Sequence, residues 1–361
     1  MNIALFTPVN TKSAIAHSSF LLENVLLQLG HTLSIVRTED EASLSLSARA
    51  FRSPISRWTD SRACRTVLAW AELVVYQVGN NLLYHKGAAY WIAIRPGLVI
   101  LHDFFLADLF SGYMAKTPKL ARKWLSHLYG AQAPDKFYHL LSTPEFYTKS
   151  AESMPLTEWI CSQATAVLTH SDWGVDRVLN SCPGPVRTQA LLYERPDIPV
   201  GRPPEHSPLR IVTIGCANRN KRFESIIRSI GSSPLLKSRV EYRIVGAGEP
   251  EFIQSMQSIA LELGVSLSYT GWIDDSTLRK EILQADIVTC LRFPTLEATS
   301  ASCIEALLYG KPSLVTDVGF YRELPNDCVV KIAPNNELSE LTEALTKLAT
   351  DAAFRRSLGE R

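Results

Sequence analysis

Apolar runs of strand length alternate with segments of helical spacing along most of the chain. In the first half the strand-like runs lie at 2–6, 31–36, 71–81, 96–106 and 164–170, and a helix ending at Gly30 is predicted over 20–30. In the second half strands are predicted at 209–215, 241–252 and 265–272, with a helix at 223–231. This alternation predicts parallel sheets covered by helices, so the expected fold class is α/β.

Five prolines between residues 194 and 208 separate the two stretches of alternation. A proline-rich segment is a stiff connection, which places a domain boundary there. We therefore predict two doubly wound, Rossmann-like domains, residues 1–195 and 196–361, that face each other across a cleft. The loop after the first strand lacks the G-x-G-x-x-G fingerprint, which argues against a dinucleotide site.

The pattern between residues 286 and 316 predicts a ligand-binding edge. An apolar strand at 286–291 is followed by a polar loop, a helix over 304–309 that Gly310 ends, and a strand at 312–316. Such a loop lies at the carboxyl edge of a parallel sheet, where open α/β proteins bind ligands. The segment holds Glu297 eight positions before Glu305, and we expect the chemistry there.

Composition and charge limit the class of protein. A chain of 361 residues with 46% hydrophobic content can form two packed cores. Lys and Arg number 37 against 36 Asp and Glu, so net charge gives no reason to expect nucleic acid as a partner. Seven scattered cysteines without a C-x-x-C pair predict reduced core thiols in a cytoplasmic protein, with neither disulfides nor a zinc site.

Membrane contact is expected to be peripheral at most. No apolar run approaches the roughly 18 to 20 residues of a membrane span, and the first ten residues turn polar before a secretory signal could form. Residues 119–129 place apolar side chains on one helical face and basic ones elsewhere. This helix either lies on the inner face of a membrane or packs on its own sheet with a solvated basic back, and we favour the second interpretation.

Two neighbouring anion sites are predicted in the second domain. One is a loop that follows the strand-end glycine Gly215 and carries three cations, Arg219, Lys221 and Arg222. The other is the start of the helix that carries Glu305, where free backbone N–H groups belong to Ser300, Ala301 and Ser302. A solvated turn is the alternative for the first loop, but two such sites together fit a diphosphate better.

The two glutamates are expected to have separate roles. If the interval between them were helical they would lie about 12 Å apart, too far to share one proton transfer. Carboxylates beyond the two ends of a diphosphate could accept hydrogen bonds from hydroxyl groups, Glu305 from a ribose and Glu297 from a sugar. The alternatives are a glutamate satisfied by backbone amides and an ordinary loop acid.

Polar residues also follow two strands of the first domain. Asn80 and His85 come after one strand, and His102 and Asp103 come directly after the next. We interpret His85 as structural and His102 as facing the cleft, because a strand-terminal His-Asp pair opens at the sheet edge. Ser171 is interpreted as a helix N-cap without a catalytic role.

Together these motifs resemble the donor-site signature of the retaining GT-B glycosyltransferases, a family that includes bacterial mannosyltransferases and sucrose synthases. The signature is E-x7-E, here Glu297 to Glu305, within a segment that continues EALLYGKPSLVTDVG. Other matches are Lys221 six residues after Gly215, the VGAG turn at 245–248, and TGWIDDSTL before ADIVTCL. In the first domain YQVGNN and PGLVILHDFFL resemble members that build bacterial surface polysaccharides.

The resemblance implies transfer of a sugar from a nucleotide-diphosphate sugar to an acceptor hydroxyl, with retention and without a metal or other cofactor. Three residues would be catalytic: His102 beside the sugar, Lys221 on the leaving diphosphate and Glu297 on the donor sugar. Glu305 would hold the ribose. The other donor contacts would come from backbone amides of Thr299 to Ser302 and, around the base, from Gly246 and Trp272. Residues 1–195 would bind a glycan or lipid-linked glycan acceptor, bordered by Gly79, Asn80 and Asp103.

Three departures from the family pattern qualify these expectations. Cys216 stands where the family often has arginine, so Arg219 or Arg222 must supply the second cation. Residues 11–19 replace a glycine-rich loop. Relatives usually continue beyond the position of Arg361 into a long helix, which implies a truncated chain or a module of a longer protein. The alternative functions are a nucleotide-sugar epimerase of the same architecture and a non-catalytic sugar-nucleotide-binding module of a larger synthase.

Overall fold

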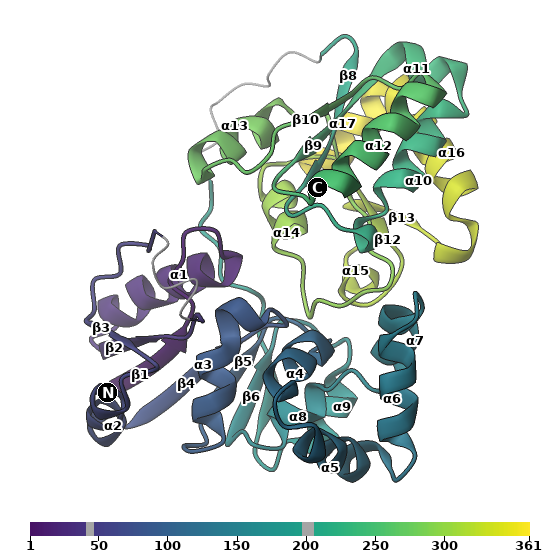
Figure 1. The fold of residues 1–361 in the computed structure, drawn as a ribbon. Coiled ribbons are helices and arrows are strands. Elements are labelled where there is room, and N and C mark those ends of the chain that lie inside the picture. Colours follow the sequence, from purple (N-terminus) through teal and green to yellow (C-terminus); the bar gives the residue numbers. More distant parts are fainter. Residues whose placement is uncertain (41–46, 197–205) are drawn as a thin grey trace. The chain divides into compact units, whose positions relative to one another are not determined.

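The computed structural model describes residues 1–40, 47–196 and 206–361, which fall into two units (Figure 1). The first unit comprises Met1–Glu194 together with Leu296–Thr299, and the second comprises Arg195–Thr295 with Ser300–Arg361. Residues 296–299 thus belong to the first unit although their neighbours in sequence belong to the second. The proline-rich segment that the sequence predicts as the connection lies largely outside the described residues.

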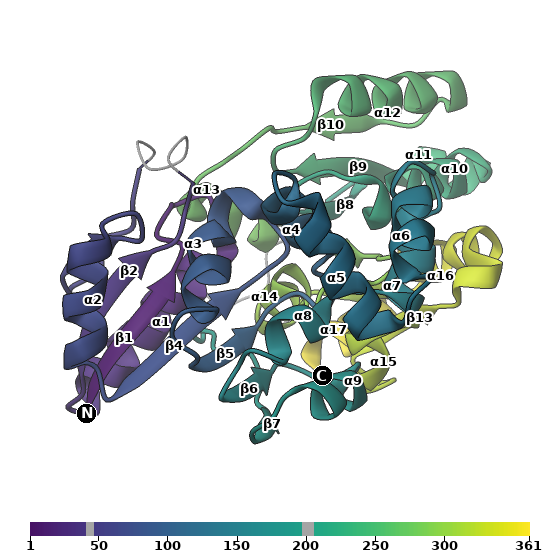
Figure 2. The same cartoon turned by 60° about the horizontal axis from the view of Figure 1, so that its bottom comes forward.

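A parallel sheet forms the centre of the first unit, and its described strands have the order β3-β2-β1-β4-β5-β6-β7 (Figure 2). The strands are β1 Asn2–Thr7, β2 Thr32–Arg37, β3 Ile55–Arg57, β4 Leu73–Val78, β5 Leu98–Leu101, β6 Ala166–Thr169 and β7 Val186–Thr188. In β1, Ile3 and Leu5 enter one hydrophobic core, whereas Ala4 and Phe6 enter the other. This alternation explains the unbroken apolar run, because both faces of the sheet are covered.

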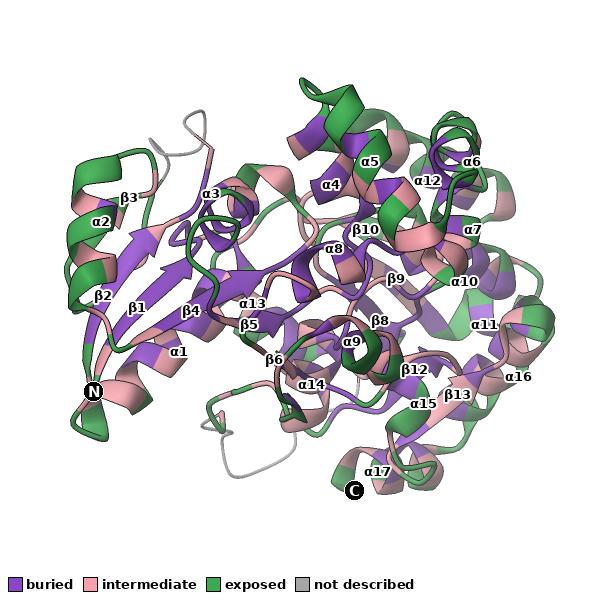
Figure 3. Cartoon of the chain, turned by 90° about the horizontal axis from the view of Figure 1, so that it is seen from below, coloured by how far each residue is buried: buried purple, intermediate pink, exposed green. Residues whose placement is uncertain are grey.

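Helices cover both faces of this sheet, and its central strands are largely buried (Figure 3). They are α1 Ala14–Gln28, α2 Ser61–Trp70, α3 Leu82–Ile92, α4 Ala107–Met114, α5 Pro118–Tyr129, α6 Ala133–Leu141, α7 Phe146–Ser153, α8 Thr157–Cys161 and α9 Val175–Ser181. On α5, Ala121 and Leu125 are buried, and Trp124 and Leu128 pack on the same core. The helix therefore packs on the core of its own unit, where its neighbours are α4, α6 and α8, whereas the sequence analysis expected it to pack on the sheet.

Two helix predictions were wrong at their starts. Helix α1 begins at Ala14 instead of residue 20, because Ser13 caps it by accepting a hydrogen bond from the Ala16 N–H at 3.2 Å. The polar Ser19 is fully buried on α1, where its hydroxyl accepts a hydrogen bond from Thr7 Oγ1 at 2.7 Å. Helix α9 begins at Val175 after a left-handed Gly174, so Ser171 is not its N-cap.

A second parallel sheet forms the centre of the second unit, with the described strands in the order β10-β9-β8-β11-β12-β13. Its strands are β8 Leu209–Ile214, β9 Val240–Val245, β10 Leu267–Tyr269, β11 Ile287–Cys290, β12 Ser313–Thr316 and β13 Val329–Ile332. The helices are α10 Phe223–Gly231, α11 Pro234–Arg239, α12 Pro250–Leu263, α13 Asp275–Gln284, α14 Ala301–Leu308, α15 Phe320–Glu323, α16 Glu337–Thr350 and α17 Ala352–Glu360. Short 3₁₀ turns lie at η2 Arg219–Lys221 and η3 Pro334–Asn336.

Both sheets have hydrophobic cores on their two faces, so the predicted α/β class with two doubly wound sheets is confirmed. The predicted cleft stays a prediction. All seven cysteines are reduced, but burial was predicted wrongly for two of them, since Cys216 is exposed in a loop and Cys328 is only partly buried. None of the described helices is long and apolar enough to cross a membrane.

Candidate functional site

The carboxyl ends of β4 and β5 bring together the three residues predicted to border the acceptor. The Asn80 N–H donates a hydrogen bond to Asp103 Oδ2 at 2.7 Å. A Cβ added at Gly79 would lie 2.9 Å from the same oxygen and 2.8 Å from His85 Nε2. Because no side chain fits there, glycine is required for this close approach of the backbone to the two polar groups.

The side chain of Asn80 caps helix α4. Its Oδ1 accepts hydrogen bonds from the Asp108 N–H at 3.0 Å and the Leu109 N–H at 3.1 Å, and its Nδ2 donates to Asp108 Oδ2 at 2.7 Å. The residue at the N-cap position of α4, Leu106, has no side-chain oxygen with which to cap the helix. Asn80 is therefore held rigidly between the ends of β4 and β5 and the start of α4.

Two buried histidines share one glutamine. Nε2 of His102 bonds Gln77 Oε1 at 2.5 Å, and Nδ1 of His85 bonds the Gln77 carbonyl at 3.1 Å. A carbonyl oxygen can only accept, so each of these ring nitrogens carries the proton. Burial lowers the pKa of His85 to about 4 and that of His102 well below its usual range, with nearby histidines as a further cause for His102. Both rings are neutral at pH 7.

Residues 296–299 place Glu297 beside the His-Asp pair within the first unit. Glu297 forms an antiparallel bridge with Asp103, and the Ala298 N–H donates to the His102 carbonyl at 2.9 Å. Burial raises the pKa of Asp103 to about 7, the hydrogen bond from the Asn80 N–H opposes this, and the charge of Glu297 adds to it. His102 and Glu297, two of the residues expected to be catalytic, are thus neighbours in the structure.

Two further residues lie at this edge, Ser171, which the sequence analysis interpreted as a helix N-cap, and His170, which it did not single out. Ser171 Oγ donates a hydrogen bond to the Ala298 carbonyl at 2.5 Å, which fixes the segment that carries Glu297. The ring of His170, at the end of β6, lies 4.8 Å from the ring of His102, measured between centroids. The rule that singled out His102, a histidine at a strand end, would have found His170 as well.

In the second unit Lys221 lies across the end of β8. It is buried, and its Nζ donates a hydrogen bond to the Ile214 carbonyl at 2.6 Å. Gly215, which follows Ile214, has φ +94°. A Cβ at this position would lie 2.5 Å from Lys221 Nζ. Glycine is needed at 215 both for the left-handed backbone and for the space that the lysine occupies.

The two arginines of the same loop differ in their surroundings. Arg222 Nε donates to both carboxylate oxygens of Glu337, at 3.0 and 2.8 Å, and Glu337 is buried at the start of α16. Arg219 is exposed and forms no ion pair with any described residue. Both line a hollow of about 1040 Å³ beside the N-terminal ends of α10, α12 and α16. Of the two arginines, Arg219 is therefore the one that is available to a ligand.

Helix α14 begins where the anion-site prediction placed its start, three residues before the 304–309 range predicted from the apolar pattern. Ala301 is its first residue, and Ser300 Oγ accepts a hydrogen bond from the Cys303 N–H at 3.4 Å. Nη2 of Arg292 donates to Ser302 Oγ at 3.4 Å, although Arg292 was not among the predicted residues. This arginine is buried two residues after the end of β11, and its place after a buried strand was the available signal.

The remaining predicted residues of the second unit lie on α14 and on the loops after β9 and β10. Burial raises the pKa of Glu305 to about 7, while Asp275 raises it further and Arg279 lowers it. Gly246 has φ +135° and pairs with Gly271, and a Cβ at 246 would lie 2.6 Å from the Gly215 carbonyl oxygen. The pairing places Gly246 close to the residue before Trp272, whose side chain is exposed.

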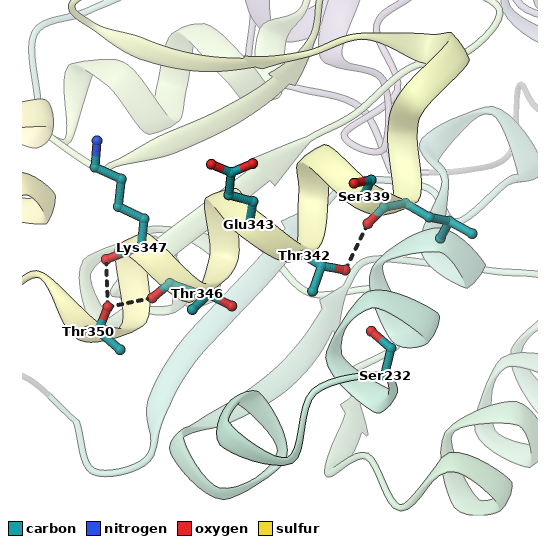
Figure 4. A pocket seen from close by; sticks show the side chains of 8 residues that line it. Ser232, Ser339, Thr342, Glu343, Thr346, Lys347 and Thr350 are labelled. Carbon is teal, nitrogen blue, oxygen red and sulfur yellow. Dashed lines mark hydrogen bonds between the residues drawn. The ribbon is translucent and has the colours of Figure 1, made fainter.

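A second hollow of about 770 Å³ follows α16 and contains none of the predicted site residues (Figure 4). Hydroxyl groups line it, but Thr342 Oγ1 donates to the Leu338 carbonyl and Thr350 Oγ1 to the Thr346 carbonyl, both at 2.8 Å. These hydroxyl protons are used within the helix itself. Among the residues with described placement, no group of three His, Cys, Asp or Glu side chains could hold a metal ion.

Comparisons with known proteins agree with the fold. Residues 195–361 match the family described as Glycosyl transferases group 1, and no curated protein sequence matches the chain. Sucrose-phosphate synthase from Thermosynechococcus elongatus has a TM-score of 0.68 at 13% identity, over 100% of this chain and 92% of that one. WaaG, a glycosyltransferase involved in lipopolysaccharide biosynthesis, gives 0.67 at 14%, over 100% and 93%. Anabaena HepE, solved with UDP-glucose, gives 0.63 at 13%, over 99% and 92%.

Proposed function

Because residues 195–361 match the family described as Glycosyl transferases group 1, we propose that this protein transfers a sugar from a nucleotide-diphosphate sugar to an acceptor hydroxyl. The observation that carries the proposal is the position of Lys221, a buried ammonium group held at the carboxyl end of β8. A fixed cation at that edge can neutralise a leaving diphosphate, which is the largest charge that develops in such a reaction. HepE, of similar fold, was solved with UDP and with UDP-glucose, which supports a donor of this class.

In this proposal the second unit holds the nucleotide. Lys221 and the exposed Arg219 contact the diphosphate, with Arg219 in the role that Cys216 cannot fill. The N–H groups at the start of α14 contribute as well, since a helix start favours an anion. Glu305 accepts hydrogen bonds from the ribose in its ionised form, and the base lies near Gly246 and Trp272.

In the first unit, His102 and Glu297 contact the transferred sugar. His102 is neutral, and its Nδ1 can accept a hydrogen bond from a hydroxyl without the ring repelling a developing cation at the anomeric carbon. Glu297 supplies a carboxylate beside it, and Gly79, Asn80 and Asp103 border the acceptor. Retention at the anomeric carbon without a metal follows from the resemblance to the E-x7-E family.

The proposed acceptor is a glycan or a lipid-linked glycan in the cytoplasm, with peripheral contact at the inner face of the membrane. The support is the basic outer face of α5, where Lys119 and Lys123 are exposed and Arg122 pairs with Asp135 of α6. Such a face is attracted to anionic lipid headgroups without inserting into the bilayer. WaaG, whose fold is similar, acts in lipopolysaccharide biosynthesis, which supports an acceptor of this kind.

The proposal is tested first by binding. A thermal-shift panel of UDP, GDP and ADP with their glucose and mannose derivatives should contain at least one sugar nucleotide that raises the melting temperature. With that donor, Lys221→Ala and Glu297→Ala should each lower transfer by about 100-fold or more while remaining folded. Lys237→Ala, an exposed lysine on α11, is the matched control and should keep full activity.

Unchanged turnover in both variants would contradict the assignment. Two other outcomes would indicate the alternative functions. Conversion of the donor sugar without any acceptor would indicate an epimerase. Binding without turnover under every acceptor would indicate a non-catalytic module, which the exposed thiol at Cys216 in place of a cation would explain.

A further inference from the structure

We propose that His170 contacts the transferred sugar directly, as a hydrogen-bond acceptor for one of its hydroxyl groups. The inference rests on the proposed function, because it assigns a further residue to the same sugar site. No motif drew attention to His170 in the sequence. Its hydrogen bonds and its surroundings in the first unit carry the argument.

The hydrogen bond of one ring nitrogen fixes the state of the other. Nδ1 of His170 lies 3.0 Å from the carbonyl oxygen of Gln189, which can only accept. Nδ1 therefore carries the proton, and Nε2 presents a lone pair. Burial lowers the pKa of this histidine, so the ring stays neutral and Nε2 remains an acceptor at neutral pH.

The acceptor at Nε2 is buried and has no hydrogen-bond partner among the residues that the structure describes. His170 is only 8% exposed, and Nε2 itself is buried, so bulk water does not satisfy this acceptor. A buried polar atom without a partner is destabilising, and native structures normally pair it with protein, water or ligand. A ligand group that donates a hydrogen bond would satisfy it.

The surroundings identify the kind of donor. The ring of His170 lies 4.8 Å from that of His102 by centroids, and the following residue, Ser171, donates to the Ala298 carbonyl next to Glu297. His170 therefore borders the pair of residues proposed to hold the sugar. His102 already uses Nε2 to donate to Gln77, and no described cluster suits a metal ion, so the two rings do not form a cation site. A sugar hydroxyl is the donor that remains.

Two variants separate the acceptor from the structural hydrogen bond. His170→Asn keeps an amide N–H near the position of Nδ1, so it can still donate to Gln189, but it removes the acceptor at Nε2. His170→Gln reaches the position of Nε2 with its amide oxygen. Affinities for the sugar nucleotide found in the thermal-shift panel, and for the matching nucleoside diphosphate, are measured by calorimetry.

We expect His170→Asn to weaken binding of the sugar nucleotide by about three- to tenfold, the usual effect of one lost hydrogen bond. Its affinity for the nucleoside diphosphate should not change, and His170→Gln should recover part of the loss. Equal weakening for both ligands, or no weakening at all, would overturn the inference, since neither depends on a contact with the sugar.

A second measurement covers the case in which the variants fail to fold. In wild-type protein with ¹⁵N-labelled histidine, the Nε2 signal of His170 should move upfield with the sugar nucleotide and stay in place with the nucleoside diphosphate. If the Nε2 signal of His170 did not shift when the sugar nucleotide binds, the inference would be overturned but the proposed function would not. A wild-type protein that binds no sugar nucleotide of the panel would overturn the proposed function, and this inference with it.

Discussion

Asp103 and Glu305 are carboxyl groups whose burial raises their pKa values to about 7. Their effect on function differs because they lie in different units. Asp103 receives the Asn80 N–H and lies beside Glu297, so it holds the backbone around the proposed sugar site in place. Glu305 can accept hydrogen bonds from ribose hydroxyls at both of its oxygens only when it is ionised, which makes donor affinity sensitive to pH near neutrality.

Asp103 also makes the stability of the protein depend on pH. Its pKa is about 7 in the folded state against an ordinary value of 3.8, so the folded state holds the proton more tightly than the unfolded state. The resulting stabilisation is complete below about pH 4 and is lost as the pH rises through 7. Asp103→Asn, which cannot titrate, should therefore lose less stability than wild type between pH 4 and 7.

The difference should be on the order of a few kcal/mol and is measured by urea unfolding at several pH values. Glu262→Gln, at an exposed carboxyl on α12, is the matched control for the removal of a carboxylate. Parallel curves for wild type and Asp103→Asn would show that Asp103 does not bind a proton in this range.

Helix starts and ends in this fold are often fixed by residues from other elements. Asn80 follows β4 but caps α4, and Glu337 at the start of α16 pairs with Arg222 before α10, 115 positions away. Each of these contacts joins an element that forms the core to a loop that carries site residues. The position of the loop therefore depends on the packing of the helices.

Replacing Asn80 by Ala should lower the free energy of unfolding by about 1 to 2 kcal/mol, because two backbone N–H groups of α4 lose their acceptor. Chemical denaturation measures the loss. Asn335→Ala, an exposed position in η3, serves as the control and should have almost no effect. If Asn80→Ala were as stable as wild type, the hydrogen bonds from the Asp108 and Leu109 N–H groups to Asn80 would contribute nothing to stability beyond what water can replace.

The central strands and the start of α14 were predictable from sequence because each leaves a local signal. Strands covered on both faces are continuous apolar runs, as in β1 and β11, and Ser300 is a typical N-cap. The start of α1 was missed because the polar Ser19 gives no signal of burial in the sequence. Its hydrogen bond with Thr7, which allows it to be buried, is seen only in the structure. Ser171 and the Arg222–Glu337 pair were not predictable, since their partners are distant in sequence.

At the scale of the whole molecule, the chain passes between its two units at three points, after residues 194, 295 and 299. The four residues Leu296–Thr299 belong to the first unit through hydrogen bonds with Phe105, His102 and Ser171. Glu297, one of the two glutamates of the motif, is held by the first unit, whereas Glu305 is held by the second. The short segment between the two glutamates therefore links the proposed sugar contact in the first unit to the proposed ribose contact in the second unit.

Ser171→Ala should loosen this segment without unfolding either unit. The Ala298 N–H, which donates to His102, and the Phe105 N–H, which donates to Leu296, should then exchange with deuterium about tenfold faster. Mass spectrometry of peptides that cover 291–303 and 103–110 measures the change. Ser181→Ala, whose hydroxyl bonds only its own helix α9, is the control. If these N–H groups exchanged at the same rate in Ser171→Ala and Ser181→Ala, Ser171 would not hold residues 296–299 in place.

The membership of residues 296–299 in the first unit has a consequence for exchanging parts between related enzymes. A chimera that joins the first unit of one protein to the second unit of another at residue 194 would leave these four residues behind. In the chimera, His102 and Ser171 of the transplanted first unit would then contact residues 296–299 of the other protein. An exchange that carries residues 296–299 along with the first unit keeps these hydrogen bonds, and the same reasoning implies that a growing chain completes its first unit only after residue 299 has been synthesised.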